Sequence, residues 1–211
     1  MFLYPLFPAQ VFLLIDLPAL LYQLDVAVFR LCNRTIANPV FDIFFPFITD
    51  LNQHWYGWVL FVGLWLLLMT KGGKKGRTVG LLVIVVVAMS DQISSKVIKY
   101  MVMRPRPCWL VDGKPIVENV RLLVSCGGGY SFPSSHAVNN FAIASYVSHY
   151  YRKWSGWFFL FAFLMAFSRL YIGVHYPSDA LGGAAIGGAC AGIVIVAWEL
   201  LSKRFPLLEI K

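Results

Sequence analysis

Long uncharged apolar runs separate the charged residues of this chain and constrain its fold more than any other feature. In the clearest run, between Asp50 and Lys71, twenty residues (51–70) carry no formal charge. A helix that spans a bilayer needs about 20 apolar residues. Aromatic residues of the kind that anchor a helix at a membrane interface gather near the start of this run, namely Trp55, Tyr56 and Trp58. We therefore predict a transmembrane helix here.

The composition extends this prediction to the whole chain. Of its 211 residues, 59% are hydrophobic and 13% are charged, whereas an average soluble domain is about 45–50% apolar and about 25% charged. A soluble body of this length cannot bury so much apolar surface, which excludes a soluble two-domain enzyme. A soluble helix bundle is excluded too, because no face of the apolar runs is polar enough to meet water.

Four further apolar runs follow, bounded by charges, at residues 78–100, 137–151, 154–168 and 180–198. Asp91 and Lys96 interrupt the first of them, and the glycine-rich segment 71–77 before it is expected to form a turn. The last contains GAAIG and GACAG, whose small-residue spacing lets helix backbones approach closely. Residues 101–135, rich in proline and glycine, are expected to form a loop.

The first fifty residues are harder to interpret. No secretory signal is evident, so we expect a first span within residues 8–30, with an interfacial helix as the alternative. Residues 38–50 are too short to cross and are expected to lie at the surface or re-enter. The sequence thus predicts one all-α integral membrane domain over residues 1–211, a polytopic bundle of six transmembrane helices whose oligomeric state is left open.

Lysine and arginine indicate the orientation of these spans. The basic segments 71–77, 151–155 and 203–211 fall on one side, which the positive-inside bias makes cytoplasmic. The 101–135 loop and the turn after Ser168 then face outward. Positive charges on the outer side oppose the bias and suggest another role; they are Arg104, Arg106, Lys114 and Arg121, with Arg30 and Arg34 if a first span exists.

Three clusters with chemical potential lie on this outer side, at residues 99–107, 133–136 and 168–179. Each alone has a structural explanation. Lys99 and Arg106 are of the kind that snorkels to the interface, PSSH resembles an ordinary helix cap, and His175 with Asp179 forms an unremarkable surface pair. Gathered on one membrane face, however, the three clusters point to chemistry on an anion.

The residue types fit a phosphate group. Arginine presents a planar fork for phosphate oxygens, and lysine adds a point charge. The N–H groups of Ser135 and His136 at a helix start favour an anion. A histidine nucleophile needs one free ring nitrogen while a carboxylate holds the other, as Asp179 is placed to do for His175. A second histidine would protonate the leaving group.

These clusters resemble the type 2 phosphatidic acid phosphatase superfamily, whose pattern is K-x6-RP, then PSGH, then SR-x5-H-x3-D. The matching residues, in order and spacing, are Lys99, Arg106 and Pro107, then Pro133, Ser134 and His136, then Ser168, Arg169, His175 and Asp179. Ser135 stands where the family usually has glycine. That position mainly offers a backbone N–H, so the serine puts the rate in question more than the activity.

The resemblance implies a membrane lipid phosphatase. His175 would attack phosphorus to form a phosphohistidine, Asp179 would orient it, and His136 would protonate the leaving group and then activate water. The phosphate-binding residues would be Lys99, Arg106, Ser134, Ser135 and Arg169. No metal and no cofactor are expected, because fixed cations and a helix N-terminus would neutralise the charge of the phosphate.

The resemblance also suggests the substrate and the location. Family members act on undecaprenyl pyrophosphate, phosphatidylglycerol phosphate, phosphatidic acid and lipid A 1-phosphate. The expected partners are therefore a lipid phosphate and membrane lipids, not nucleic acid, despite the net charge of +8. A bacterial inner membrane is expected, with the site facing the periplasm or exterior. A lipid phosphotransferase and a non-catalytic transporter are the alternatives. Vanadate-dependent haloperoxidases share the pocket residues, but they are soluble proteins, and the composition of this chain argues against them.

Three smaller features stay open. Cys108 and Cys126 lie in the outer loop, where an oxidising compartment would permit a bridge, but free thiols are the alternative. Cys190 is interpreted as a small packing residue within a span, and Cys32 is uninformative. Asp91 is either a partner for Lys96 or Lys99 or a polar residue buried between helices.

Overall fold

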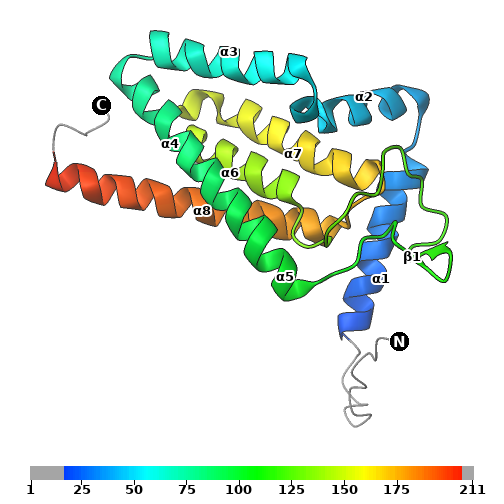
Figure 1. Cartoon of the computed structure of the whole chain (residues 1–211). Coiled ribbons are helices and arrows are strands. Elements are labelled where there is room, and N and C mark those ends of the chain that lie inside the picture. Colours follow the sequence, from blue (N-terminus) through cyan, green and yellow to red (C-terminus); the bar gives the residue numbers. More distant parts are fainter. Residues whose placement is uncertain (1–16, 206–211) are drawn as a thin grey trace.

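The apolar runs fold as helices (Figure 1). The computed structural model describes residues 17–205, in which the helices are α1 (Leu17–Arg30), α2 (Pro39–Thr49), α3 (Trp55–Lys71), α4 (Gly73–Gln92), α5 (Lys99–Val102), α6 (Ser135–Tyr150), α7 (Ser155–Tyr171) and α8 (Pro177–Arg204). Shorter helical segments connect some of them: η1 (Leu31–Thr35), η2 (Leu51–Gln53), η3 (Ile93–Ile98) and η4 (Arg152–Trp154). The early part of the predicted first span and the last six residues of the tail lie outside the described residues.

Two helical stretches of the described chain are long and apolar enough to cross a membrane. One is Gly73–Val102, in which α4, η3 and α5 are continuous over 30 residues, and the other is the 28-residue α8. At about 1.5 Å per residue, both exceed the roughly 30 Å hydrocarbon core. Helices α2 and α3 are apolar but shorter. Large apolar side chains are exposed along the bundle surface, as lipid contact requires, among them Trp58, Leu64, Leu81, Phe163 and Ile193.

The predicted turn over residues 71–77 is wrong in extent. Helix α3 ends at Lys71 and α4 begins at Gly73, so Lys74, Lys75 and Arg77 lie in the first turns of α4. Gly73 adopts a φ of +61°, which lets the chain reverse at a single residue. Lysine and arginine are good helix formers, so the helix resumes at once.

Helix α6 lies at the centre of the bundle and packs against α4, α7 and α8. The closest approach is between α6 and α8. A Cβ atom on Gly187 would lie 2.3 Å from the carbonyl oxygen of Val138, and one on Gly183 would lie 2.8 Å from the Cβ of Ala137. The predicted close packing through small residues is confirmed, with the buried Cys190 in the same helix as a packing residue.

The segment between α5 and α6 is a loop, as predicted, with one small hairpin of β1 (Leu110–Val111) and β2 (Lys114–Pro115). A disulfide joins Cys108 to Cys126 within this loop, which decides between the two alternatives left by the sequence. The loop lies at the end of the bundle where α6 and α8 begin and α7 ends, beside α1 (Figure 1). This arrangement brings the three sequence clusters to one end of the molecule.

Candidate active site

His175 and Asp179 form a buried pair at the start of α8. His175 lies in the turn between α7 and α8, and its Nδ1–H donates to Oδ2 of Asp179 at 3.4 Å. The same oxygen accepts the backbone N–H of Tyr176 at 2.8 Å and the hydroxyl of Ser131. The other ring nitrogen of His175, Nε2, makes no hydrogen bond within the described part of the chain. That nitrogen is therefore free to react.

The surroundings of His175 keep its ring neutral. Burial lowers the pKa of His175, because the imidazolium form would lose its hydration. The carboxylate of Asp179 opposes this shift, whereas Arg106 and Arg169 add to it. A neutral ring is the form that carries a free electron pair on Nε2, which is what a nucleophile needs.

Arg106 is fixed by the backbone of the outer loop. Its Nε donates to the carbonyl of Gly129 at 2.9 Å, its Nη1 to that of Cys126 at 3.0 Å, and its Nη2 to that of Gly128 at 3.5 Å. Guanidinium has five N–H donors, so two remain for an anion. The Cys108–Cys126 disulfide holds one of these carbonyls in place.

Two polar atoms of the predicted phosphate site are buried without a partner. Ser134 precedes the first residue of α6, yet its hydroxyl makes no capping hydrogen bond and has no other partner. The Nε of Arg169 is likewise buried and unpartnered. Buried polar groups are nearly always hydrogen-bonded. The ordinary-cap explanation for PSSH is thus wrong, and both atoms are available to an anion.

Three cations influence one another electrostatically around these atoms. The Nζ of Lys99 donates to the carbonyl of Tyr130 at 2.9 Å. The ammonium group of Lys99 is repelled electrostatically by both Arg106 and Arg169. Arg106 and Arg169 also sense each other. Like charges held together in a poorly hydrated site favour an anion between them. The structure therefore gathers all three predicted cations at one place.

His136 faces the end of α2 across the same site. Its Nε2 lies 3.2 Å from the carbonyl oxygen of Thr49, the last residue of α2. It interacts electrostatically with Arg169, His175 and Lys99. The carbonyl oxygen can only accept, so Nε2 carries a proton and Nδ1 is the nitrogen left to exchange one.

The hydroxyl of Ser135 points away from this group, toward the membrane span. Its Oγ lies 3.2 Å from that of Ser95 in η3, and Ser95 donates to Asp91 at 3.4 Å. Asp91 also accepts the amide of Asn139 at 3.1 Å and has no ion pair with a described lysine. Asp91 is half-buried and also interacts electrostatically with Lys99, so both of its interpretations stay open. The backbone N–H role of Ser135 stays a prediction.

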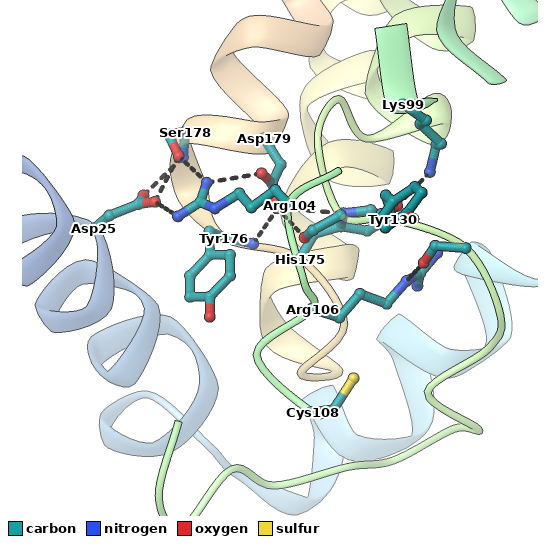
Figure 2. Close-up of polar contacts among 12 residues, drawn as sticks. Asp25, Lys99, Arg104, Arg106, Cys108, Tyr130, His175, Tyr176, Ser178 and Asp179 are labelled. Carbon is teal, nitrogen blue, oxygen red and sulfur yellow. Dashed lines mark hydrogen bonds and ion pairs between the residues drawn. The ribbon is translucent and has the colours of Figure 1, made fainter. Parts of the chain in front are cut away.

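Several residues that the sequence did not assign to the site contact it. Thr49 touches both His136 and Arg169, Ser131 donates to Asp179, and Arg104 lies between Asp179 and Asp25 of α1 (Figure 2). Arg104 lies within the first cluster, in the repeat RPRP. This repeat is the one sequence signal that could have assigned Arg104 to the site. Within residues 17–205, no three His, Cys, Asp or Glu side chains gather as a metal site would require, and the metal-free expectation stays a prediction.

Curated proteins of other organisms are similar to this chain in sequence. The lipid A 4'-phosphatase of Bacteroides thetaiotaomicron is 38% identical over 105 residues, which cover 48% of this chain and 46% of that protein. The undecaprenyl-diphosphatase BcrC of Bacillus subtilis is 28% identical over 166 residues, 78% of this chain and 77% of that protein. The chain thus spans about half the length of the first of these curated relatives.

A solved structure shares the fold. The crystal structure of Aquifex aeolicus LpxE superposes with a TM-score of 0.63 at 30% sequence identity, covering 82% of this chain and 95% of that one. The family model of the PAP2 superfamily matches residues 78–203, which include all three sequence clusters and every helix from α6 to the last turn of α8. Over this majority of its length, the chain belongs to the PAP2 superfamily.

Proposed function

We propose that this protein is a membrane lipid phosphatase that hydrolyses a lipid phosphate or pyrophosphate through a phosphohistidine, without a metal. The observation that carries the proposal is the pair of buried, unpartnered atoms, Ser134 Oγ and Arg169 Nε, on residues whose backbones hydrogen-bond to Asp179 and His175. A phosphoryl group would satisfy both atoms. The curated relatives support the same class of reaction, because one is named a lipid A 4'-phosphatase and the other an undecaprenyl-diphosphatase.

The first step forms a covalent intermediate. The electron pair on Nε2 of His175 makes a bond to phosphorus while the bond from phosphorus to the lipid oxygen breaks. With the anionic substrate bound, His136 enters this step with a second proton on Nδ1 and gives that proton to the lipid oxygen, so the lipid leaves as a neutral alcohol or as a lipid phosphate. Asp179 stabilises the ring of His175 while it carries the phosphoryl group and keeps its proton on Nδ1.

The second step releases phosphate. Water attacks phosphorus and transfers a proton to His136, and the bond between phosphorus and Nε2 breaks. The electron pair returns to His175, and both histidines are back in their starting states. Lys99, Arg106 and Arg169 would hold the phosphoryl oxygens throughout, with the hydroxyl of Ser134 and the N–H groups at the start of α6.

We further propose that residues 1–211 form one membrane domain with six transmembrane helices, in a bacterial inner membrane. The site then lies at the outer interface, and the α3–α4 turn with its basic residues faces the cytoplasm. A membrane-impermeant amine reagent added to intact cells should leave Lys74 unmodified, and should modify it after permeabilisation. Labelling of Lys74 in intact cells would show that the orientation is the opposite of the one proposed.

The function is tested by release of inorganic phosphate from a lipid panel. The purified protein would be assayed with undecaprenyl diphosphate, phosphatidylglycerol phosphate, phosphatidic acid and lipid A phosphorylated at both positions, in the presence of EDTA. We expect phosphate from at least one lipid, with activity unaffected by the chelator. Activity that collapses in EDTA contradicts the metal-free mechanism, and transfer to a second lipid without free phosphate identifies a phosphotransferase.

A histidine pair provides the matched control. His175→Ala should lower the rate by a factor on the order of 10⁴, because it removes the nucleophile. His149→Ala should retain activity, since His149 lies at the other end of α6 and pairs with Glu199. Wild-type phosphate release by folded His175→Ala would rule out a phosphohistidine on His175. No release by the wild type from any lipid would favour the non-catalytic alternative.

A further inference from the structure

Arg104 bridges two carboxylates that come from opposite ends of the sequence. Its Nη2 donates to Oδ2 of Asp25 at 2.6 Å, and its Nη1 donates to Oδ1 of Asp179 at 2.8 Å. The same Nη1 donates to the hydroxyl of Ser178 at 2.6 Å. Asp25 lies in α1, whereas Ser178 and Asp179 lie in the first turn of α8. One guanidinium thus ties α1 to the carboxylate that holds His175.

Asp25 also binds the start of α8 directly. Its Oδ1 accepts the backbone N–H of Ser178 at 2.8 Å, and its Oδ2 accepts the hydroxyl of Ser178 at 2.5 Å. An acidic side chain at a helix N-terminus is stabilised by the free N–H groups there. Asp25 therefore fixes both Arg104 and the helix that carries Asp179.

The cluster is enclosed. The ring of Tyr176 lies 3.9 Å from Cζ of Arg104, and Phe29 of α1 packs against that ring. The side chains of Arg104, Asp25 and Asp179 are 20%, 8% and 0% exposed. Although burial acts to lower the pKa of Arg104, Asp179 and Asp25 outweigh it and raise the pKa. Arg104 is therefore a permanent cation in this cluster.

Arg104 lies on the side of Asp179 that faces away from the predicted phosphate. Figure 2 shows its guanidinium between Asp25 and Asp179, with His175 next and Lys99 and Arg106 beyond it. Its Nη groups are committed to Asp25, Ser178 and Asp179. Unlike Arg106, it is not placed to reach a phosphoryl oxygen.

The two oxygens of Asp179 divide their partners accordingly. Oδ2 accepts from His175 and Oδ1 accepts from Arg104. A buried carboxylate that loses its cation is strongly destabilised in its charged form. Without Arg104, Oδ1 of Asp179 would lose its cation while Oδ2 keeps the Tyr176 N–H and the Ser131 hydroxyl, so the carboxyl would take up a proton more readily. A protonated Asp179 could not hold the proton on Nδ1 of His175.

We propose that Arg104, held by Asp25 of α1, is a positioning residue that keeps Asp179 ionised and oriented, and through Asp179 fixes the tautomer of His175. The inference rests on the proposed function for its kinetic consequences, but the state of the His175 ring is measurable without catalysis. It also gives α1, which lies outside the three motif clusters, a part in the site.

The kinetic test compares Arg104→Gln with a matched control. We expect Arg104→Gln to lower kcat about 10- to 100-fold, as loss of an orienting partner does elsewhere, with KM and inhibition by inorganic phosphate unchanged. Arg104→Lys should recover part of kcat, because its ammonium still neutralises one carboxylate. Arg121→Gln removes a comparable ion pair, with Asp42 of α2, and should leave kcat near wild type.

The pH profile separates positioning from simple loss of folded protein. Charged and titratable groups face His175 from each neighbouring element: Asp179 from α8, Arg169 from α7, His136 from α6 and Arg106 from the loop. Removing Arg104 takes a positive charge away from the His175–Asp179 pair, so this pair takes up a proton at a higher pH than in the wild type. The acid limb of kcat/KM should therefore move to higher pH in Arg104→Gln and stay in place in Arg121→Gln.

Nitrogen NMR of histidine-labelled protein provides the readout that needs no substrate. The Nδ1–H signal of His175 should be present in the wild type and Arg121→Gln, and weakened or shifted in Arg104→Gln. Asp25→Asn, which keeps Arg104, should give a smaller change, and its effect should not add to that of Arg104→Gln. If Asp25→Asn has the same His175 Nδ1–H signal and the same kcat as the wild type, the proposed role of α1 is wrong. This test does not depend on whether Arg104→Gln folds.

Two further results would overturn the proposal itself. One is an Arg104→Gln protein whose His175 signal and acid limb match the wild type. The other is a parallel rise of KM and of the phosphate inhibition constant, which would make Arg104 a phosphate ligand. A wild type that shows the expected Nδ1–H signal but releases no phosphate from any lipid would contradict the proposed function and leave the positioning of His175 standing.

Discussion

Thr49 and Arg169 meet across the site although 120 residues separate them in the chain. The Nη1 of Arg169 donates to Oγ1 of Thr49 at 2.9 Å, and the hydroxyl of Ser168 donates to the same oxygen at 3.0 Å. Thr49 is fully buried at the end of α2. The hydroxyl of Thr49 therefore sets the position of a cation that the phosphate would meet.

Replacing this hydroxyl should weaken substrate binding. In Thr49→Val the shape is kept, but Arg169 loses an acceptor in a buried place, which costs about 1–3 kcal/mol. We expect KM to rise about tenfold, roughly 1.4 kcal/mol of binding free energy. Thr49→Ser keeps the hydroxyl and should behave as wild type. Equal KM values for the valine and serine variants would show that Arg169 does not depend on this contact.

The burial of His175 predicts how activity and stability respond to acid. A pKa below the ordinary 6.5 keeps the ring neutral, and so nucleophilic, at mildly acidic pH. Because the unfolded chain binds this proton near pH 6.5 and the folded protein does not, this group makes the fold less stable as the pH falls below 6.5. Histidine NMR, assigned with His175→Gln, should show a neutral ring at pH 5.5. A midpoint at or above 6.5 would contradict the prediction.

The loop disulfide should support both stability and phosphate binding. Closing a loop of 18 residues in sequence is worth ~3 kcal/mol in the chain-entropy model. The Cys126 carbonyl also holds Arg106. The double variant Cys108→Ser/Cys126→Ser should melt at lower temperature, bind substrate more weakly and no longer respond to reductant. A variant that lacks Cys32 and Cys190 should still lose stability when reduced, and its failure to do so would contradict the prediction.

Two glycines of α8 offer a direct test of the helix packing. Gly187→Ala would place its Cβ 2.3 Å from the Val138 carbonyl oxygen of α6, whereas a Cβ on Gly192 meets nothing within 4 Å. We expect Gly187→Ala to destabilise the protein by about 1–3 kcal/mol through overpacking. Gly192→Ala should be neutral or stabilising, because alanine is the better helix former. The measurement is thermal unfolding in detergent, and similar melting temperatures for the two variants would refute the tight α6–α8 contact.

Much of the site could be predicted because its residues are grouped in short segments. His175 and Asp179 are one helical turn apart, and Ser134 with His136 marks the start of α6. The predicted α3–α4 turn was too long, because the positive φ of Gly73 lets the chain change direction without a longer loop. The sequence had no local signal for the contacts of Thr49.

The sequence by itself determined the membrane-directed apolar helices, the glycine spacing of α8 and the set of chemical groups available for an anion. Only the tertiary structure decided which of these groups have partners. It left Ser134 and Arg169 with unpartnered atoms, turned Ser135 toward Asp91, and joined Arg104 to Asp25. The physical reason is that hydrogen bonds and ion pairs between helices depend on distances in space, and a periodic pattern along one helix records only which face is buried.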